Sequence, residues 1–345
     1  MKRFIRMHGF NLVSDGDLDA VFATGLLINA MLKCGYNSIL DGSVYFPRIR
    51  EIKGKKVTGK ILMELRMEKG LIYKGENLLI DHHPDPPRIV LYRDDKVLLV
   101  RKFGLNVSVA GLISYIFSDV LDVPPELIDA VDGADYKNYI LEQSKKISRA
   151  FLISRNIPDK EIIDTLLSRL DMGEYAGKPI VNYFLEQAKN SFVYGFIPMA
   201  IIKERWDVLE EWIALESSRY EELIAPVVKR LYDKCKRRGE IAYVIYDYGD
   251  LKERTAVDEI LYTIQTENEI GVIIGVTSRG FLVRAASFRQ DVLLREICRY
   301  VRLPYIDCYG TGEFVNLYFP NQYYDLSGVL RIVLGQFIKM INKRN

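Results

Sequence analysis

The sequence lacks long apolar runs and paired cysteines, and each shortage excludes a class of protein. No apolar run approaches the roughly 20 residues that span a membrane, and the opening MKRFIRMHGFNLVSDGD contains no apolar signal core. The four cysteines include no CxxC pair, which argues against a zinc knuckle or a disulfide framework and predicts reduced thiols. We therefore expect a soluble, cytoplasmic protein that does not act at a membrane.

An excess of either charge is also missing. Forty-eight basic residues stand against 46 acidic ones, a formal net charge of +2, so binding to nucleic acid would require a local patch. With 49% hydrophobic and 27% charged residues, the chain is globular rather than disordered. Abundant Ile, Tyr, Lys, Arg and Glu beside few His and Cys indicate a thermophile.

The order of apolar and helical runs predicts an α/β protein. In the first 140 residues, short apolar strands such as GKILMELR and ENLLIDHH alternate with helical runs, which predicts a parallel sheet with helices on both faces. A long helical region with a break at Pro226 then runs to Gly239. The domains that we expect are a parallel-sheet domain with flanking helices at 1–204, a helical connector at 205–240 and a smaller α/β domain at 241–345, with a cleft between the two domains.

Three aspartates, Asp15, Asp17 and Asp19, stand at alternate positions in SDGDLDA. Carboxylates this close repel one another unless a cation gathers them. Ligands of parallel sheets bind beyond the carboxyl ends of strands, so a cation site after the first strand is one interpretation. A DGD turn in which Asp17 or Asp19 caps the next helix is the other.

The stretch LLIDHHPDPP, residues 78–87, ends another predicted strand with Asp81, His82 and His83. These are two of only three histidines in the chain. Carboxylates combined with imidazole suit Mn²⁺ and recur in two-metal hydrolases. An Asp–His surface turn would need no metal, but two such motifs at strand ends of one sheet favour a metal site.

A third acidic group occurs in LIDAVDGADYKN, which contains Asp129, Asp132 and Asp135. Asp129 is expected on a helix, and Asp132 and Asp135 are expected in the turn that follows it. Ordinary turn chemistry would explain the last two aspartates without a ligand.

Together SDGDLDAVFATGLL, LLIDHHPDPP and AVDGADY resemble the motifs of the DHH phosphoesterase superfamily. This superfamily includes RecJ-type exonucleases, nano-RNases, phosphoadenosine-phosphate phosphatases and inorganic pyrophosphatases, and the first motif here is closest to the RecJ-type spacing. The resemblance implies a site for two Mn²⁺ ions, with Mg²⁺ as the other candidate. It implies catalytic roles for Asp81 and His83, the latter toward the phosphate. The metal ligands that it implies are Asp15, Asp17, Asp19, Asp81, His82 and Asp132.

The resemblance extends loosely to the second half of the chain. The smaller DHH-associated domain of the family binds substrate through a strand arginine and a Gly-Gly-Gly-His loop. The segment GFLVRAAS provides Arg284, and DCYGTGEFVNLYF provides Gly310 and Gly312. Arg284 suits bidentate binding of a phosphate, and the glycines would let backbone N–H groups approach an anion.

Two residues depart from the family pattern. Glu64 stands where the family has a metal-bridging aspartate, and its extra methylene moves the carboxylate oxygens by about a bond length. It is either a substitute bridging ligand or the polar residue that closes a strand. Glu313 stands where the C-terminal loop normally has histidine, and a carboxylate facing a phosphate is repulsive.

The sequence thus predicts a metal-dependent hydrolase, a phosphoesterase that cleaves phosphodiester or phosphomonoester bonds of nucleotides or short single-stranded oligonucleotides. Two cations about 3.5–4 Å apart would bind the phosphate and activate a shared water, and Arg284 would hold a phosphate across the cleft. A catalytically weakened scaffold in a replication or repair complex is the alternative, and a homodimer is a further expected assembly. An inorganic pyrophosphatase fits less well, because the C-terminal loop lacks basic residues.

Overall fold

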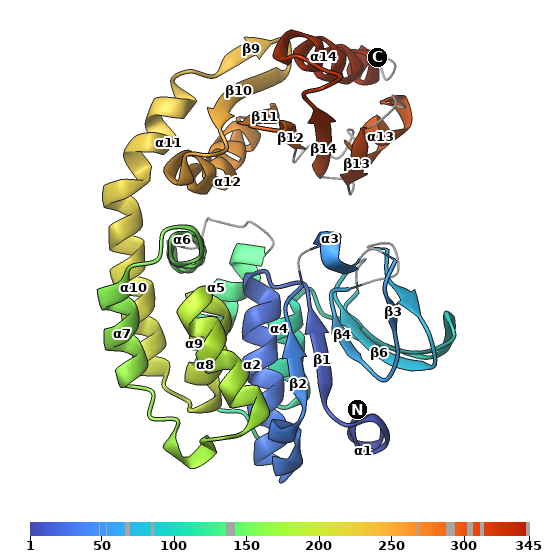
Figure 1. The fold of residues 1–345 in the computed structure, drawn as a ribbon, viewed down its shortest axis with the longest axis vertical. Coiled ribbons are helices and arrows are strands. Elements are labelled where there is room, and N and C mark those ends of the chain that lie inside the picture. Colours follow the sequence, from blue (N-terminus) through green and yellow to red (C-terminus); the bar gives the residue numbers. More distant parts are fainter. Residues whose placement is uncertain are drawn as a thin grey trace. The chain divides into compact units, whose positions relative to one another are not determined.

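The computed structural model describes residues 1–47, 49–52, 54–65, 70–83, 86–135, 142–267, 269–287, 294–301, 306–310 and 314–342. The chain divides into two compact units, Met1–Ser217 and Ser218–Asn345, and Figure 1 shows their helices and strands. Every helix within these described ranges is too short or too polar to cross a membrane.

The first unit contains six strands of a main sheet, two strands of a small sheet and most of the helices. Its elements are α1 (Lys2–His8), β1 (Asn11–Ser14), α2 (Leu18–Lys33), η1 (Asn37–Asp41), β2 (Ser43–Tyr45), α3 (Ile49–Ile52), β3 (Lys56–Val57), β4 (Ile61–Met63), β5 (Ile72–Tyr73), β6 (Glu76–Asp81), β7 (Arg88–Arg93), β8 (Lys96–Lys102), α4 (Val109–Ile116), α5 (Pro125–Asp135), α6 (Glu142–Asn156), α7 (Lys160–Ser168), η3 (Gly173–Tyr175), α8 (Pro179–Asn190), α9 (Phe192–Ile202) and α10 (Trp206–Leu223), the last of which continues past Ser217.

The second unit contains one sheet with helices. Its elements are α11 (Ala225–Tyr232), β9 (Lys236–Arg238), β10 (Ile241–Asp247), α12 (Leu251–Thr266), β11 (Ile270–Thr277), β12 (Gly280–Ala286), η4 (Leu294–Glu296), α13 (Ile297–Tyr300), β13 (Asp307–Gly310), β14 (Phe314–Pro320) and α14 (Leu326–Asn342).

The main sheet of the first unit has the order β2-β1-β4-β6-β7-β8. Its first four strands are parallel, which confirms the predicted α/β class and its parallel sheet. Strands β7 and β8 extend this sheet as an antiparallel hairpin. The sequence analysis did not predict this hairpin, because the apolar residues of β8 do not alternate with polar ones. In the structure every residue of β8 is exposed.

Alternate residues of the parallel strands enter two different cores, as the pleat of a strand requires. Leu12, Met63 and Ile80 pack with the helices, including α2, α4 and α9. Val13, Leu62 and Leu79 face the opposite side, where residues of α3, β3 and β5 cover them. Of the described elements, the short helix α3 and the small β3–β5 sheet lie on the second face, so helices cover both faces as predicted, but on the second face only through α3.

Helix α2 occupies the centre of the first unit and is buried from Leu18 to Met31. Gly25 allows α9 to approach it closely. A Cβ atom at Gly25 would lie 2.9 Å from Cβ of Ile201 and 3.0 Å from Cα of Pro198. Since α2 cannot move within a packed core, it rigidly positions the residues that precede it.

The second sheet has the order β13-β14-β12-β11-β10-β9, and within it β10 and β11 are parallel. Helix α12 packs on β10 and β11, while α14 joins the core built on Val272, Ile274 and Val283. The two helices therefore lie on opposite faces of this sheet (Figure 1).

The connector differs in part from the predicted helix. The break near Pro226 is confirmed, because α10 ends at Leu223 and Pro226 lies in the first turn of α11. The prediction that the helix continues to Gly239 was wrong. Lys236–Arg238 form β9, which pairs with β10 in antiparallel register, so sheet pairing overrides the helical propensity of this basic segment.

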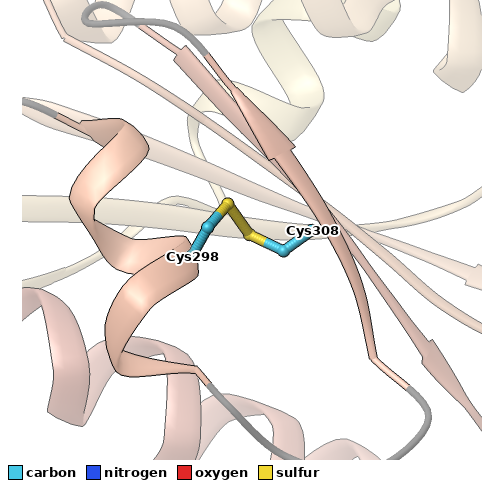
Figure 2. The surroundings of a disulfide bond; sticks show 2 residues. All are labelled: Cys298 and Cys308. Atoms are coloured by element: carbon cyan, nitrogen blue, oxygen red, sulfur yellow. A yellow bond between two sulfur atoms is a disulfide. The ribbon is translucent and has the colours of Figure 1, made fainter. Parts of the chain in front are cut away.

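A disulfide joins Cys298 of α13 to Cys308 of β13, with a Cα–Cα distance of 5.5 Å (Figure 2). Cys34 and Cys235 are free. The expectation that all thiols are reduced was therefore wrong for this pair. The spacing of ten residues between the two cysteines matches no recognised sequence motif, and only the packing of α13 against β13 brings them together.

We expect Cys298→Ser to lower the free energy of unfolding by about 2–3 kcal/mol, the loop-closure entropy of a crosslink of this size. The measurement is urea denaturation without reductant. Treatment of the wild type with a phosphine reductant should produce the same loss, and Cys34→Ser should leave stability nearly unchanged. Equal stability of the wild type and Cys298→Ser under oxidising conditions would contradict the crosslink.

Candidate metal centre

The candidate residues lie at one edge of the main sheet because three parallel strands end there. Strand β1 pairs with β4, and β4 pairs with β6. Asp15 follows β1, Glu64 follows β4, and Asp81 ends β6. Segments that are 17 to 66 residues apart in the chain are thereby brought to one edge, as the sequence predicted for the aspartates and the DHH triplet.

The turn after β1 carries two candidate metal ligands, Asp15 and Asp17, and one of them also caps the next helix. Gly16 has φ +77°, a conformation that glycine adopts without steric cost. Asp17 is the N-cap of α2 and accepts a hydrogen bond from the Ala20 N–H at 2.9 Å. Capping uses one oxygen of Asp17, so the two interpretations of this motif are compatible.

Asp19 is buried and is fixed by another helix. Its two carboxylate oxygens accept hydrogen bonds of 2.7 Å from the N–H groups of Val109 and Ala110, the first residues of α4. A helix N-terminus offers unpaired N–H groups and a partial positive charge. This contact holds the Asp19 carboxylate in position and stabilises its charge.

Glu64 has an unusual backbone and an unusual environment. Its φ is +58°, a region rarely occupied by residues with long side chains, and its side chain is only 3% exposed. Its backbone N–H donates to the Ile80 carbonyl at 3.0 Å. Burial, followed by the charges of Asp15, Asp17 and Asp19, raises the pKa of Glu64 well above its ordinary value. Strain and a buried charge together are typical of functional sites.

The DHH triplet presents one buried and one exposed imidazole. Asp81 and His82 are buried, whereas the His83 side chain is 48% exposed. An Asp81 oxygen accepts the His83 backbone N–H at 3.0 Å. His82 Nε2 lies 3.6 Å from Glu64 Oε1. His82 thus lies within the cluster of candidate ligands, and the His83 side chain reaches solvent.

Arg88 is a residue at this site that the sequence analysis missed. It pairs with Asp81 across β6 and β7, where its guanidinium lies 3.9 Å from Asp81 Oδ2. It also donates to the His83 carbonyl at 3.2 Å. No sequence signal could identify it, because the antiparallel hairpin that sets this register was not predicted.

The third acidic group differs from its prediction. Asp132 and Asp135 lie within α5, not in a turn after it. Asp135 Oδ2 is 3.2 Å from His82 Nε2. Asp132 instead accepts the Ser108 N–H at 3.0 Å beside the start of α4. The structure therefore places Asp135 at the cluster and Asp132 behind it, while the sequence comparison had favoured Asp132.

The pKa values of both residues are raised. Burial raises the pKa of Asp132 to about 6, against the opposing effect of its hydrogen bonds with Ser108. Burial and the charges of Asp19, Asp17 and Asp15 raise the pKa of Asp135 well above its ordinary value. Burial and mutual repulsion thus disfavour the anionic forms of both carboxyl groups.

Ligand atoms of seven residues form three overlapping sets, in each of which the atoms lie within 4.8 Å of one another. The sets are Asp15–Asp17–Glu64, Glu64–His82–His83 and Asp19–His82–Asp135. Glu64 and His82 each belong to two sets. Among the residues described, Asp81 and Asp132 from the predicted ligands belong to none of them.

The donor set fits divalent manganese or magnesium. Carboxylate oxygens dominate, one or two imidazoles supplement them, and no thiolate takes part. Within the described part of the chain, the buried Glu64 Oε1 and Asp135 Oδ2 atoms form no hydrogen bond. A cation would compensate both of these buried acceptors.

The predicted substrate residues belong to the second unit. Arg284 lies on β12 and forms an ion pair with Asp258 of α12. Gly310 ends β13. Gly312 and Glu313 lie outside the described residues.

Solved structures with similarity to this chain include the three described next, although no family model and no curated protein matches the sequence. One is PggH, a pGpG-specific phosphodiesterase from Vibrio cholerae, with a TM-score of 0.50 and 13% identity over 96% of this chain and 99% of that one. An exopolyphosphatase-related protein from Bacteroides fragilis has a TM-score of 0.50 and 10% identity over 98% and 94% of the two chains. A DHH domain of a member of the s1p family of ribosomal proteins has a TM-score of 0.49 and 11% identity over 99% and 90%.

These similarities extend over nearly the whole length of this chain and of its neighbours. The chain is a two-unit α/β protein whose first sheet carries a cluster of candidate metal-ligand side chains. It shares its fold with PggH and with the exopolyphosphatase-related protein, which agrees with the fold that the DHH resemblance of the sequence implied.

Proposed function

We propose that this protein is a divalent-metal-dependent phosphoesterase that hydrolyses phosphodiester or phosphomonoester bonds of nucleotides or short single-stranded oligonucleotides. The observation that carries the proposal is the sharing of Glu64 and His82 between overlapping ligand sets. Shared ligands are what two neighbouring cations require, and in this proposal Glu64 would take the bridging role.

The chain's residues divide the work at this site. Asp15, Asp17, Asp19, His82 and Asp135 would hold the cations with Glu64, while buried Asp81 would orient His83 through the hydrogen bond to its backbone. When bound, the metal pair would supply Lewis-acid stabilisation of phosphate charge and activate water. His83 is exposed enough to contact the phosphate, and Arg88 steadies the His83 backbone.

In the second unit, we propose that Arg284 binds a further phosphate of the substrate, with Gly310 and Gly312 offering backbone N–H groups. The guanidinium fits a phosphate bidentately. Asp258 would compete for the same group, since it pairs with Arg284 in the structure.

The test is hydrolysis of 5′-labelled RNA and DNA of two to five residues, including pGpG, with chelator, Mg²⁺ or Mn²⁺. We expect turnover only with a divalent cation, and a loss of about 10–100-fold with Asp81→Asn, which keeps the shape of the buried side chain. This variant also serves as the control for a co-purifying nuclease.

The substrate set is extended to cyclic dinucleotides and pAp. If neither the wild type nor Asp81→Asn hydrolyses any of these substrates, the proposal that the protein is an enzyme is rejected. The scaffold alternative would then be the better explanation. Cation binding measured by calorimetry separates the two failures, because a scaffold that has lost only catalysis can still bind Mn²⁺.

A further inference from the structure

Three aromatic residues that are distant in the sequence form one cluster beside the metal centre. Phe46 follows β2, Tyr183 lies on α8, and Tyr194 lies on α9. The rings of Phe46 and Tyr194 are stacked, with centroids 5.2 Å apart and planes at 22°. Tyr183 lies 6.5 Å from Phe46. We call these three residues the aromatic cluster.

The aromatic cluster touches the turn that carries Asp15 and Asp17. A Cβ atom at Gly16 would lie 3.3 Å from Cε1 of Tyr194 and 3.4 Å from Cβ of Phe46. The topology explains this contact, because β2 is parallel to β1 and their carboxyl ends share one edge of the sheet. The rings are therefore immediate neighbours of the candidate metal ligands.

The rings of the aromatic cluster differ from core aromatics on the same helices. Phe184 of α8 and Phe196 of α9 are completely buried, whereas Tyr183, Tyr194 and Phe46 are each partly exposed. Core packing alone does not require aromatic rings at positions that reach solvent. Phe46, Tyr183 and Tyr194 pack against the core and yet remain partly exposed beside the turn that carries Asp15 and Asp17.

The aromatic cluster is also held in place, and a cationic side chain lies beside it. The Phe46 backbone N–H donates to the Tyr183 hydroxyl at 3.3 Å, which ties the end of β2 to α8. The exposed Arg155 of α6 places its guanidinium 5.9 Å from the centre of the Tyr194 ring. A π platform beside a cation suits a flat aromatic group that carries a phosphate.

We propose that the aromatic cluster binds a nucleobase of the substrate by stacking while the attached phosphate lies at the acidic cluster. This inference rests on the proposed function and names its substrate class: a nucleotide unit whose base adjoins the reacting phosphate. Base–aromatic stacking tolerates any base, so the cluster selects for a nucleoside over a bare phosphate, with little sequence preference.

The test compares Phe46→Leu with the wild type on two substrates, a dinucleotide and its analogue with abasic residues at both positions. Leucine keeps an apolar side chain and removes the ring. We expect the KM for the dinucleotide to rise about tenfold with kcat little changed, and the KM for the abasic analogue to stay constant. Phe46→Tyr should restore the wild-type KM, and Tyr115→Leu, at an exposed aromatic of α4, is the matched control.

An equal change of KM on both substrates would overturn the base contact, as would no change on either. As a control, the melting temperature of Phe46→Leu is measured with and without Mn²⁺. A shift equal to that of the wild type would show that the substitution leaves the acidic turn intact.

A binding measurement separates this inference from the proposed function. Stacking quenches a 2-aminopurine dinucleotide whether or not hydrolysis follows. Quenching by wild type that Phe46→Leu loses would support the base contact even in a protein that turns over nothing. Quenching that is absent, or equal in both proteins, would overturn it.

Discussion

Replacing Glu64 with glutamine should reduce metal-dependent hydrolysis more than about a hundredfold, beyond the 10–100-fold typical of residues that only support a ligand. The same variant should gain about 1–2 kcal/mol of stability above pH 7 when free of metal. Both effects have one cause. Glu64 is buried among three carboxylates that raise its pKa, so its charge is unfavourable until a cation compensates it. Hydrolysis rates and urea denaturation in chelator measure the two effects.

Two further variants separate charge from backbone strain. Glu64→Asp introduces the residue that the DHH resemblance implies at this position, and aspartate tolerates the left-handed region better than glutamate, so the variant should retain activity that Glu64→Gln lacks. Glu204 also has a positive φ, +52°, but pairs with Lys33 away from the acidic cluster. Glu204→Gln should therefore leave hydrolysis unchanged. Full activity of Glu64→Gln would show that Glu64 only closes a strand.

The metal-free protein should lose stability as the pH rises from 4 to 7, and Mn²⁺ should reverse this loss. The folded-state pKa of Asp132 is about 6, above the ordinary value of about 3.9 in an unfolded chain. Between these values the folded state holds a proton that the unfolded state has released, so stability falls with rising pH. This difference corresponds to about 2–3 kcal/mol. Glu64 and Asp135, whose pKa values are also raised, add to the loss with the same sign.

Urea denaturation at pH 4.5, 6 and 7.5 in chelator measures this dependence. Asp132→Asn should flatten part of the slope. Asp207 contributes a pH dependence of stability with the opposite sign, because its hydrogen bond with Arg205 lowers its pKa to about 2. This contribution is small, because the pair is exposed to solvent. Stability that rises with pH in chelator would show that the carboxyl cluster is not destabilising.

Much of the site was predictable because its parts are local in the sequence. Asp15, Asp17 and Asp19 surround one turn, and the DHH triplet ends one strand. Alternating strands and helices indicate a parallel sheet, and parallel strands bring their carboxyl ends to one edge. The proximity of these motifs follows from that rule without knowledge of the packing.

The choice between Asp132 and Asp135 was not predictable in the same way. The two residues are three positions apart on α5 and share one face of the helix. The position of α4 decides between them, because the N–H of Ser108 binds Asp132 while Asp135 reaches His82. That contact depends on how two helices pack.

The amino-acid sequence by itself therefore determined the fold class and the types of candidate metal ligand, since hydrophobic periodicity and motif chemistry depend only on residues close together in the sequence. Tertiary structure decided the Cys298–Cys308 disulfide, the pairing of Arg88 with Asp81 and the aromatic cluster around Gly16. Each of these joins segments whose distance depends on register and helix packing. Those quantities arise from the whole core, and no short stretch of sequence specifies them.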